Sequence, residues 1–229
     1  MAEPARIALY YAPETEDPLW ALGSAWLGRD AETGAALPQP ANISAQTTDP
    51  RRYGFHATLR APMALRHGLD AFLADAAALA ASLAPFPLPD LAVTRLGDYL
   101  ALCLATPSPE MAALERACVI GLDRHRVPED AATQAKRAQG RPPHQLENLA
   151  RWGYPMVLED FLFHMTLSNA LPNNPLAPLA EAHFGTSLRA PRVVKSLAIF
   201  VEPEPGAPFR LTRRFGLGCA APAHPASGV

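Results

Sequence analysis

Gly54-Phe-His-Ala-Thr-Leu-Arg60 and Leu162-Phe-His-Met-Thr-Leu-Ser168 are two copies of one pattern, Phe-His-x-Thr-Leu. None of the five other histidines of the chain has a serine or threonine two positions later. About one His-x-Ser/Thr is expected by chance in a chain of this composition, but two copies with the same flanking residues are far more specific. The two motifs are therefore the strongest candidates for the functional residues of the chain.

Each motif has the alternation of a β-strand that is apolar on one side and polar on the other. Residues two apart in a strand point to the same face. The core would then be faced by three residues of each motif: the phenylalanine, the residue between histidine and threonine, and the leucine. The polar faces would present two rows to a cleft, His56/Thr58/Arg60 and His164/Thr166/Ser168.

The order of predicted elements also occurs twice: a strand with the motif, a helix, and a two-stranded hairpin. The first copy runs from about Gly54 to Ala105 and the second from about Phe161 to Leu217. Turn and helix signals support this order, including Asp17-Pro18 before an early helix that ends near Gly28. We expect an α+β fold of two pseudo-symmetric lobes, each an antiparallel sheet with packed helices, with the active cleft between them.

We expect residues 1–219 to form one two-lobed domain. Lobe 1 would cover about 30–107, and lobe 2 would cover about 156–218 together with the N-terminal strand Arg6–Ala12. Residues 108–155 would connect them as helices, predicted at Pro109–Arg126, Glu129–Ala138 and His144–Trp152. Residues 220–229 are predicted to be a disordered tail.

Composition sets limits on partners. A net charge of −2 argues against extended nucleic-acid binding. Three adjacent basic pairs are candidate phosphate contacts, although solvated surface charge is the commoner explanation for each: Arg51-Arg52, Lys136-Arg137 and Arg213-Arg214. The sequence contains no membrane-length apolar run and no signal-peptide pattern, so we expect a cytoplasmic protein with no membrane partner. Cys103 and Cys118 lie in apolar runs and should be core residues.

Paired histidines and threonines suit the cleavage of a phosphodiester by in-line displacement. One imidazole takes a proton from the attacking water and the other gives a proton to the leaving oxygen. Threonine hydroxyls can donate hydrogen bonds to the phosphate oxygens that gain charge. Arg60 and Ser168 are candidate phosphate contacts. Tyr10 and Tyr154 could close over a ligand, although apolar packing is the commoner explanation for both tyrosines. We expect no metal and no cofactor, because no metal-ligand spacing stands beside either motif.

The motifs resemble those of the 2H phosphoesterase superfamily, in which two His-x-Thr/Ser elements lie on strands of a duplicated α+β fold. Within it, five strings resemble a subgroup of bacterial phosphonate-metabolism proteins filed as a domain of unknown function: Tyr10–Pro13, Gly23–Asp30, Arg52–Leu59, Trp152–Pro155 and Phe163–Leu167. The resemblance implies that His56 and His164 are the acid-base pair. It also implies that Thr58 and Thr166 bind the phosphate oxygens.

We therefore expect a metal-independent phosphoesterase that hydrolyses a small cyclic phosphodiester, with a link to phosphonate metabolism implied by the resemblance. A small phosphorylated compound would be the substrate. Two alternatives remain open from the sequence. One is the processing of RNA 2′,3′-cyclic or 2′-5′ ends by the same four residues, and the other is a non-catalytic module that binds a nucleotide or phosphometabolite.

Overall fold

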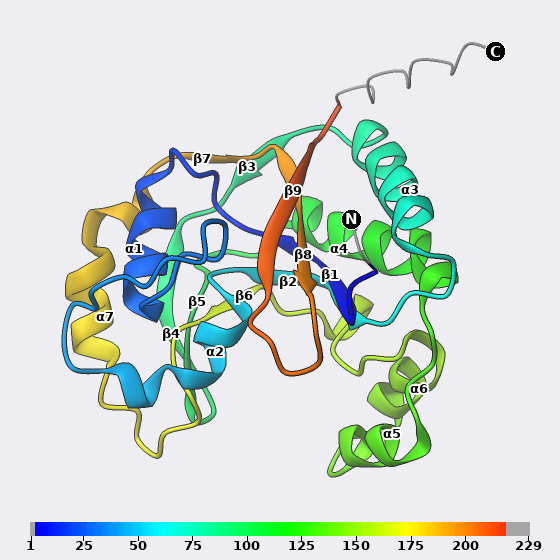
Figure 1. The fold of residues 1–229 in the computed structure, drawn as a ribbon. Helices are drawn as coiled ribbons and strands as arrows, with labels where there is room; N and C mark the ends of the chain where they lie inside the picture. Colours follow the sequence, from blue (N-terminus) through cyan, green and yellow to red (C-terminus); the bar gives the residue numbers. More distant parts are fainter. Residues whose placement is uncertain (1–2, 219–229) are drawn as a thin grey trace.

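The centre of the molecule is one antiparallel sheet of seven strands in the order β4-β5-β6-β2-β1-β8-β9 (Figure 1). The computed structural model describes residues 3–218. The strands of this sheet are β1 (Arg6–Tyr11), β2 (Ala57–Met63), β4 (Leu91–Leu96), β5 (Tyr99–Leu104), β6 (His164–Thr166), β8 (Ser196–Glu202) and β9 (Arg210–Gly216). A second sheet pairs β3 (Phe86–Leu88) with β7 (Arg192–Val194). The expected α+β class with antiparallel sheets is confirmed.

The helices are α1 (Pro18–Leu27), α2 (Thr48–Tyr53), α3 (Leu69–Ala81), α4 (Pro109–Gly121), α5 (Ala131–Ala138), α6 (Pro143–Trp152) and α7 (Ala177–Phe184). Helices α1 and α7 lie beside each other near β4, at one edge of the large sheet (Figure 1). Helix α3 packs against β9 at the other edge, α4 packs against the middle strand β2, and α5 and α6 pack against each other. Helix α1 begins and ends as predicted, with the Asp17 side chain accepting a hydrogen bond from Leu19 N and Gly28 closing the helix at φ 73°.

The two motif strands meet at the middle of the sheet. One half of the sheet contains β2 with β1, β8 and β9, and the other half contains β6 with β5 and β4. The pair Ala57–Met165 joins the two halves. The predicted lobe ranges, about 30–107 and 156–218, do not follow the halves of the sheet. The reason is that β5, from the first range, pairs with β6 from the second, while β2 pairs with β1.

Several element boundaries follow from strand pairing. Strand β6 contains only His164–Thr166, the residues that pair with β5. Residues 192–202 divide at Lys195 into two strands, because β7 pairs with β3 while β8 joins the large sheet. The helix predicted at Pro109–Arg126 ends earlier, at Gly121. The predicted tail, 220–229, lies outside the described residues.

Strand β1 lies inside the large sheet, between β2 and β8, and is buried on both faces. Ile7, Leu9 and Tyr11 join the main hydrophobic core. The alternate residues, among them Tyr10, join a second cluster with Phe200 and Phe209. Cys103 and Cys118 are buried, as predicted. Within the described residues, no helix has the length and apolar character to cross a membrane.

Candidate active site

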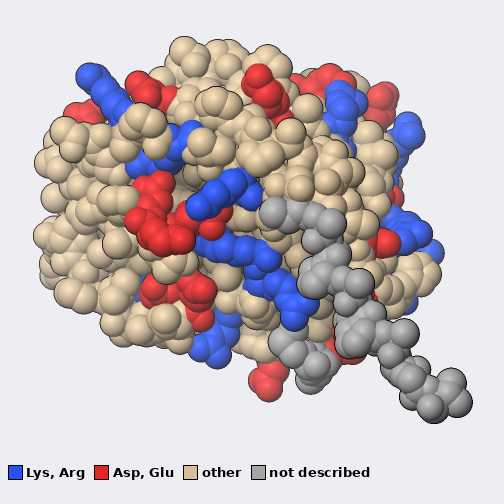
Figure 2. All heavy atoms as spheres, turned by 90° about the horizontal axis from the view of Figure 1, so that it is seen from above, with Lys and Arg blue, Asp and Glu red and all other residues tan. Residues whose placement is uncertain are grey.

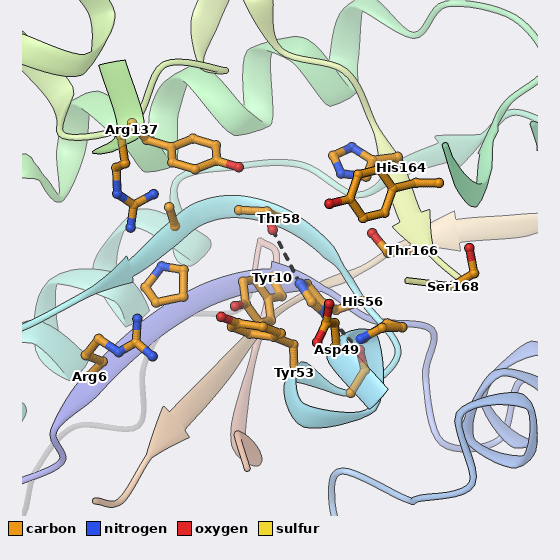
Figure 3. A pocket seen from close by; sticks show the side chains of 16 residues that line it. Arg6, Tyr10, Asp49, Tyr53, His56, Thr58, Arg137, His164, Thr166 and Ser168 are labelled. Carbon is orange, nitrogen blue, oxygen red and sulfur yellow. Dashed lines mark hydrogen bonds between the residues drawn. The ribbon is translucent and has the colours of Figure 1, made fainter. Parts of the chain in front are cut away.

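A cavity of about 270 Å³ opens where β2 and β6 meet, and all four motif residues line it (Figure 3). Ala57 pairs with Met165 across the junction, and both are buried. The residues that flank this pair therefore point to the opposite face of the sheet. In this register Thr58 is placed opposite His164, and His56 opposite Thr166. The structure thus brings together the two predicted pairs.

The segment before His56 is fixed by close packing. Gly54 ends α2 with φ 84°, and a Cβ on it would lie 2.6 Å from that of Ala31. The Phe55 ring is buried and fills the space that a side chain at Gly23 would need, since a Cβ there would lie 2.1 Å from the ring. These contacts hold the backbone on either side of Phe55, and His56 then faces the cavity.

The two imidazoles are held in the same way. Nδ1 of His56 lies 2.9 Å from the carbonyl oxygen of Gly54, two residues earlier. Nδ1 of His164 lies 2.8 Å from the carbonyl oxygen of Leu162, also two residues earlier. A carbonyl can only accept, so each Nδ1 carries a proton. Each Nε2 is then left to exchange a proton with a ligand.

His56 is neutral at ordinary pH in this environment. Burial lowers its pKa to about 4, the hydrogen bond to Gly54 opposes that effect, and the nearby charge of His164 adds to it. The Thr58 hydroxyl lies 3.3 Å from Nε2 of His56. A neutral imidazole with Nδ1 protonated has a free electron pair on Nε2, which is the form that a general base requires.

Tyr10 and Tyr154 both line the cavity. The Tyr10 ring stacks on the His56 imidazole with centroids 3.6 Å apart. Tyr10 is buried, so its part in the site is to support the histidine. Tyr154 is only partly buried and lies beside the guanidinium of Arg137.

Arg60 does not extend the polar row, contrary to the prediction. The pairing of β1 with β2 matches Tyr10 to Thr58 and Leu9 to Arg60, so one extra residue is inserted on β2. This bulge reverses the alternation and turns Arg60 to the face opposite Thr58. Arg60 is 2% exposed; its Nη2 donates to Asp123 Oδ1 at 2.7 Å and its Nη1 to Trp152 O at 3.3 Å.

Ser168 lines the cavity, but its hydroxyl is already occupied by protein groups. Ser168 Oγ donates to the carbonyl of Asn169 at 2.8 Å and accepts from Leu100 N at 3.0 Å and Asn174 Nδ2 at 2.7 Å. The side chain is completely buried. These bonds fix the chain after β6, and they correct the expectation that Ser168 binds phosphate.

The cavity also contains residues that the motif analysis did not assign to it. Arg6 comes from β1 and Arg137 from α5, and their guanidinium groups lie at the end of the cavity away from His164 (Figure 3). In the sequence, Arg137 stands out only as half of the basic pair Lys136-Arg137. Further lining residues that were missed are Asp49, Tyr53 and Tyr99. No local spacing signals Arg6, because its place depends on how β1 pairs with β2.

No metal site stands out at this cavity. Across residues 3–218, no group of three or more histidine, cysteine, aspartate or glutamate side chains is arranged to hold a metal ion. The titratable groups of the motifs themselves are two histidines. The chemistry that the site can perform with its own residues is therefore proton transfer at Nε2 and hydrogen bonding from the threonine hydroxyls.

The solved structures that match this chain have low sequence identity to it. A crystal structure of a phosphoesterase is 13% identical with a TM-score of 0.45, and the match covers 93% of this chain and 99% of that one. E. coli LigT complexed with 3′-AMP is 14% identical with a TM-score of 0.49, covering 94% of this chain and 99% of that one.

Two curated sequence relatives have higher identity to this chain than these solved structures have. The ribose 1,5-bisphosphate phosphokinase PhnN of Laribacter hongkongensis is 39% identical over 217 residues, which are 91% of this chain and 51% of the relative. The protein of the same name from a Janthinobacterium species is 37% identical over 225 residues, 89% of this chain and 49% of the relative. The chain spans about half the length of the curated relatives that it matches.

A family model described as "Protein of unknown function (DUF1045)" matches residues 58–210, which is more than half of the chain. This match begins at Thr58 and includes the whole second motif. It agrees with the subgroup of unknown function that the motif strings resemble. The chain belongs to the DUF1045 family.

Proposed function

We propose that this protein is a metal-independent phosphoesterase that hydrolyses a small cyclic phosphodiester, with His56 and His164 as its acid-base pair. One observation carries the proposal. Two histidines, each held through Nδ1 by the carbonyl two residues earlier, line one cavity together with Thr58 and Thr166. Such a symmetric pair supplies the proton acceptor and the proton donor that in-line displacement at phosphorus requires.

The environment of His56 favours it as the base. Burial keeps it neutral, so Nε2 can take a proton from water as the water oxygen bonds to phosphorus. The bond from phosphorus to one ring oxygen breaks, and that oxygen receives a proton from Nε2 of His164. Thr58 and Thr166 donate hydrogen bonds to the two non-bridging oxygens. The product is a phosphomonoester with a free hydroxyl beside it.

The size of the cavity favours a small substrate. Its volume of about 270 Å³ lies at the low end of what ligand pockets offer. The relatives named ribose 1,5-bisphosphate phosphokinase suggest a ribose derivative. Opening a 1,2-cyclic phosphate on ribose 5-phosphate would give ribose 1,5-bisphosphate. We therefore propose a ribose cyclic phosphate as the substrate and phosphonate metabolism as its setting.

A turnover screen in the presence of EDTA tests the proposal. The panel contains ribose 5-phosphate 1,2-cyclic phosphate and the four nucleoside 2′,3′-cyclic phosphates. We expect turnover of at least one compound and a loss of at least ~100-fold in kcat for His56→Ala and His164→Ala. His67→Ala is the matched control, because His67 is exposed and lies outside the cavity lining.

Three results would overturn the proposal: near-normal turnover in either motif variant, loss of activity in EDTA, or tight binding of a panel compound without turnover. The last would favour a binding module. Turnover only of RNA ends, with binding that weakens steeply as salt rises, would favour RNA processing. On the face drawn in Figure 2, one central group of basic side chains is bordered by acidic ones and the other basic side chains are scattered, so this face offers no long basic track to RNA.

A further inference from the structure

The candidate active site has a second charged end that the acid-base mechanism does not use. Arg6 and Arg137 both line the cavity, and their guanidinium groups lie at the end of it away from His164 (Figure 3). They come from segments far apart in the chain, the first strand and α5. Two guanidinium groups that converge on one cavity are a common arrangement for binding a phosphate.

Arg6 is held so that its terminal amino groups are available to a ligand. Its Nε donates to Glu202 Oε2 at 2.5 Å. Glu202 is 1% exposed and also accepts from Arg52 Nη2 at 2.5 Å and from Gly206 N at 2.9 Å. Burial alone would raise the pKa of Glu202, but the hydrogen bonds from Arg6 and Arg52 lower it to about 2. A buried carboxylate thus fixes the Nε side of Arg6, and the other side faces the cavity.

Arg137 is fixed in a similar way. Its Nε lies 2.7 Å from Glu129 Oε2 and its Nη2 donates to Glu129 Oε1 at 2.8 Å. The Tyr154 ring lies beside the guanidinium, 5.6 Å from ring centroid to Cζ. One edge of Arg137 is therefore occupied by the carboxylate, and one face is covered by the ring. Its Nη1 remains for the cavity. Both arginines are oriented by acidic residues outside the cavity lining, so little side-chain entropy is lost when an anion binds.

We propose that Arg6 and Arg137 form a second anion subsite, which binds a phosphomonoester on the same molecule whose cyclic phosphate lies between the histidines. This inference rests on the proposed function and narrows its substrate class to cyclic phosphodiesters that carry an additional phosphate. A phosphomonoester has a charge of about −1.5 to −2 at neutral pH, which suits two guanidinium groups. The cavity lining also includes Ala61 and Pro62, apolar residues that can pack against a sugar ring.

The test compares two substrates that differ only in the second phosphate, ribose 5-phosphate 1,2-cyclic phosphate and ribose 1,2-cyclic phosphate. We expect Arg6→Gln and Arg137→Gln each to lower kcat/KM for the first by at least ~10-fold, mainly through KM, with little change for the second. Arg6→Lys, which keeps a cation beside Glu202, should retain part of the activity. Arg66→Gln is the matched control, since Arg66 is exposed and outside the cavity lining. Equal losses on both substrates, or no loss, would overturn the proposal.

A binding experiment separates this inference from the proposed reaction. Calorimetry with ribose 5-phosphate measures occupancy of the subsite and needs no turnover. We expect binding that weakens at least ~10-fold in Arg6→Gln and in Arg137→Gln but is retained in His164→Ala. If no cyclic substrate is turned over and this pattern still holds, the reaction is wrong and the subsite stands. Binding that is absent, or unaffected by either arginine variant, would refute the subsite.

Discussion

The ring of Tyr10 lies nearly parallel to the imidazole of His56, with ring centroids 3.6 Å apart and an angle of 20° between the planes. Tyr10 is on β1, directly paired with Thr58 on β2, and its other neighbour is the Phe200 ring at 5.0 Å. The stack and the hydrogen bond to Gly54 O hold the imidazole from two directions. The orientation of the proposed base is therefore set by a residue far from it in sequence.

Replacing Tyr10 by Phe should leave activity close to that of the wild type, because the ring supplies the contact. Tyr10→Ala removes a buried aromatic side chain, and we expect it to destabilise the protein by about 3–5 kcal/mol. It should also lower kcat, because His56 loses one of its supports. Chemical unfolding and steady-state kinetics measure the two effects. A fully active Tyr10→Ala variant would mean that the stack does not position His56.

The pH dependence of kcat/KM distinguishes the base from the acid. That quantity reports the ionisation of the free enzyme. If His56 is the base, it must be neutral, so kcat/KM should rise with pH through about 4 and then stay level on that side of the profile. If His56 were the acid, activity would fall as pH rises through about 4. The measurement is kcat/KM on a cyclic phosphate at pH values on both sides of that pKa, over the range where the fold persists by circular dichroism.

The ion pair of Arg60 with Asp123 should matter for stability and not for substrate binding. Arg60 is buried and lies on the face of β2 away from the cavity. Asp123→Ala leaves its guanidinium without a carboxylate and should cost about 3–5 kcal/mol of unfolding free energy. KM should change little. A large increase in KM with unchanged stability would restore Arg60 as a phosphate contact.

Glu115 should make the protein less stable as pH rises. It is 1% exposed and accepts hydrogen bonds from Leu158 N at 3.2 Å on both oxygens. Burial raises its pKa to about 7, against the opposing effects of the Leu158 amide and of Arg116 and Arg60. The folded state therefore keeps a proton between pH ~4.3 and 7 that the unfolded chain releases, so the contribution of Glu115 to stability falls across that window.

Glu115→Gln removes this titration while keeping an oxygen for the Leu158 amide. Relative to the wild type, the variant should gain stability as pH rises from about 4.3 to 7, by no more than about 1.4 kcal/mol per pH unit. Urea unfolding of both proteins at several pH values gives the comparison. A difference between them that does not change with pH would show that Glu115 has an ordinary pKa.

The sequence predicted the histidines and threonines of the site because their signal is local. Alternation along a strand depends only on backbone geometry, and a shared pattern around His56 and His164 is visible without knowing which strands pair. The ends of α1 could also be predicted from local signals, because Asp17, Pro18 and Gly28 stabilise the ends of the helix that they flank. The antiparallel α+β class followed from the order of such elements.

The sequence could not predict the register in which the strands pair. The bulge opposite Leu9 and Tyr10 turns Arg60 away from the cavity, although simple alternation places it beside Thr58. The lobe ranges failed for a related reason, because β6 pairs with β5, which lies far earlier in the chain. Which strands become neighbours is decided by the packing of the whole core.

The paired histidines were thus determined by the sequence alone, through side-chain alternation and a repeated motif. The tertiary structure decided what surrounds them: Tyr10 against His56, the Ser168 hydroxyl bound by the backbone amide of Leu100, and Arg6 and Arg137 at the far end of the cavity. Each of those relationships joins residues that no local spacing connects. They arise only when β1, the motif strands and α5 are brought together by burial of the apolar faces of the sheet.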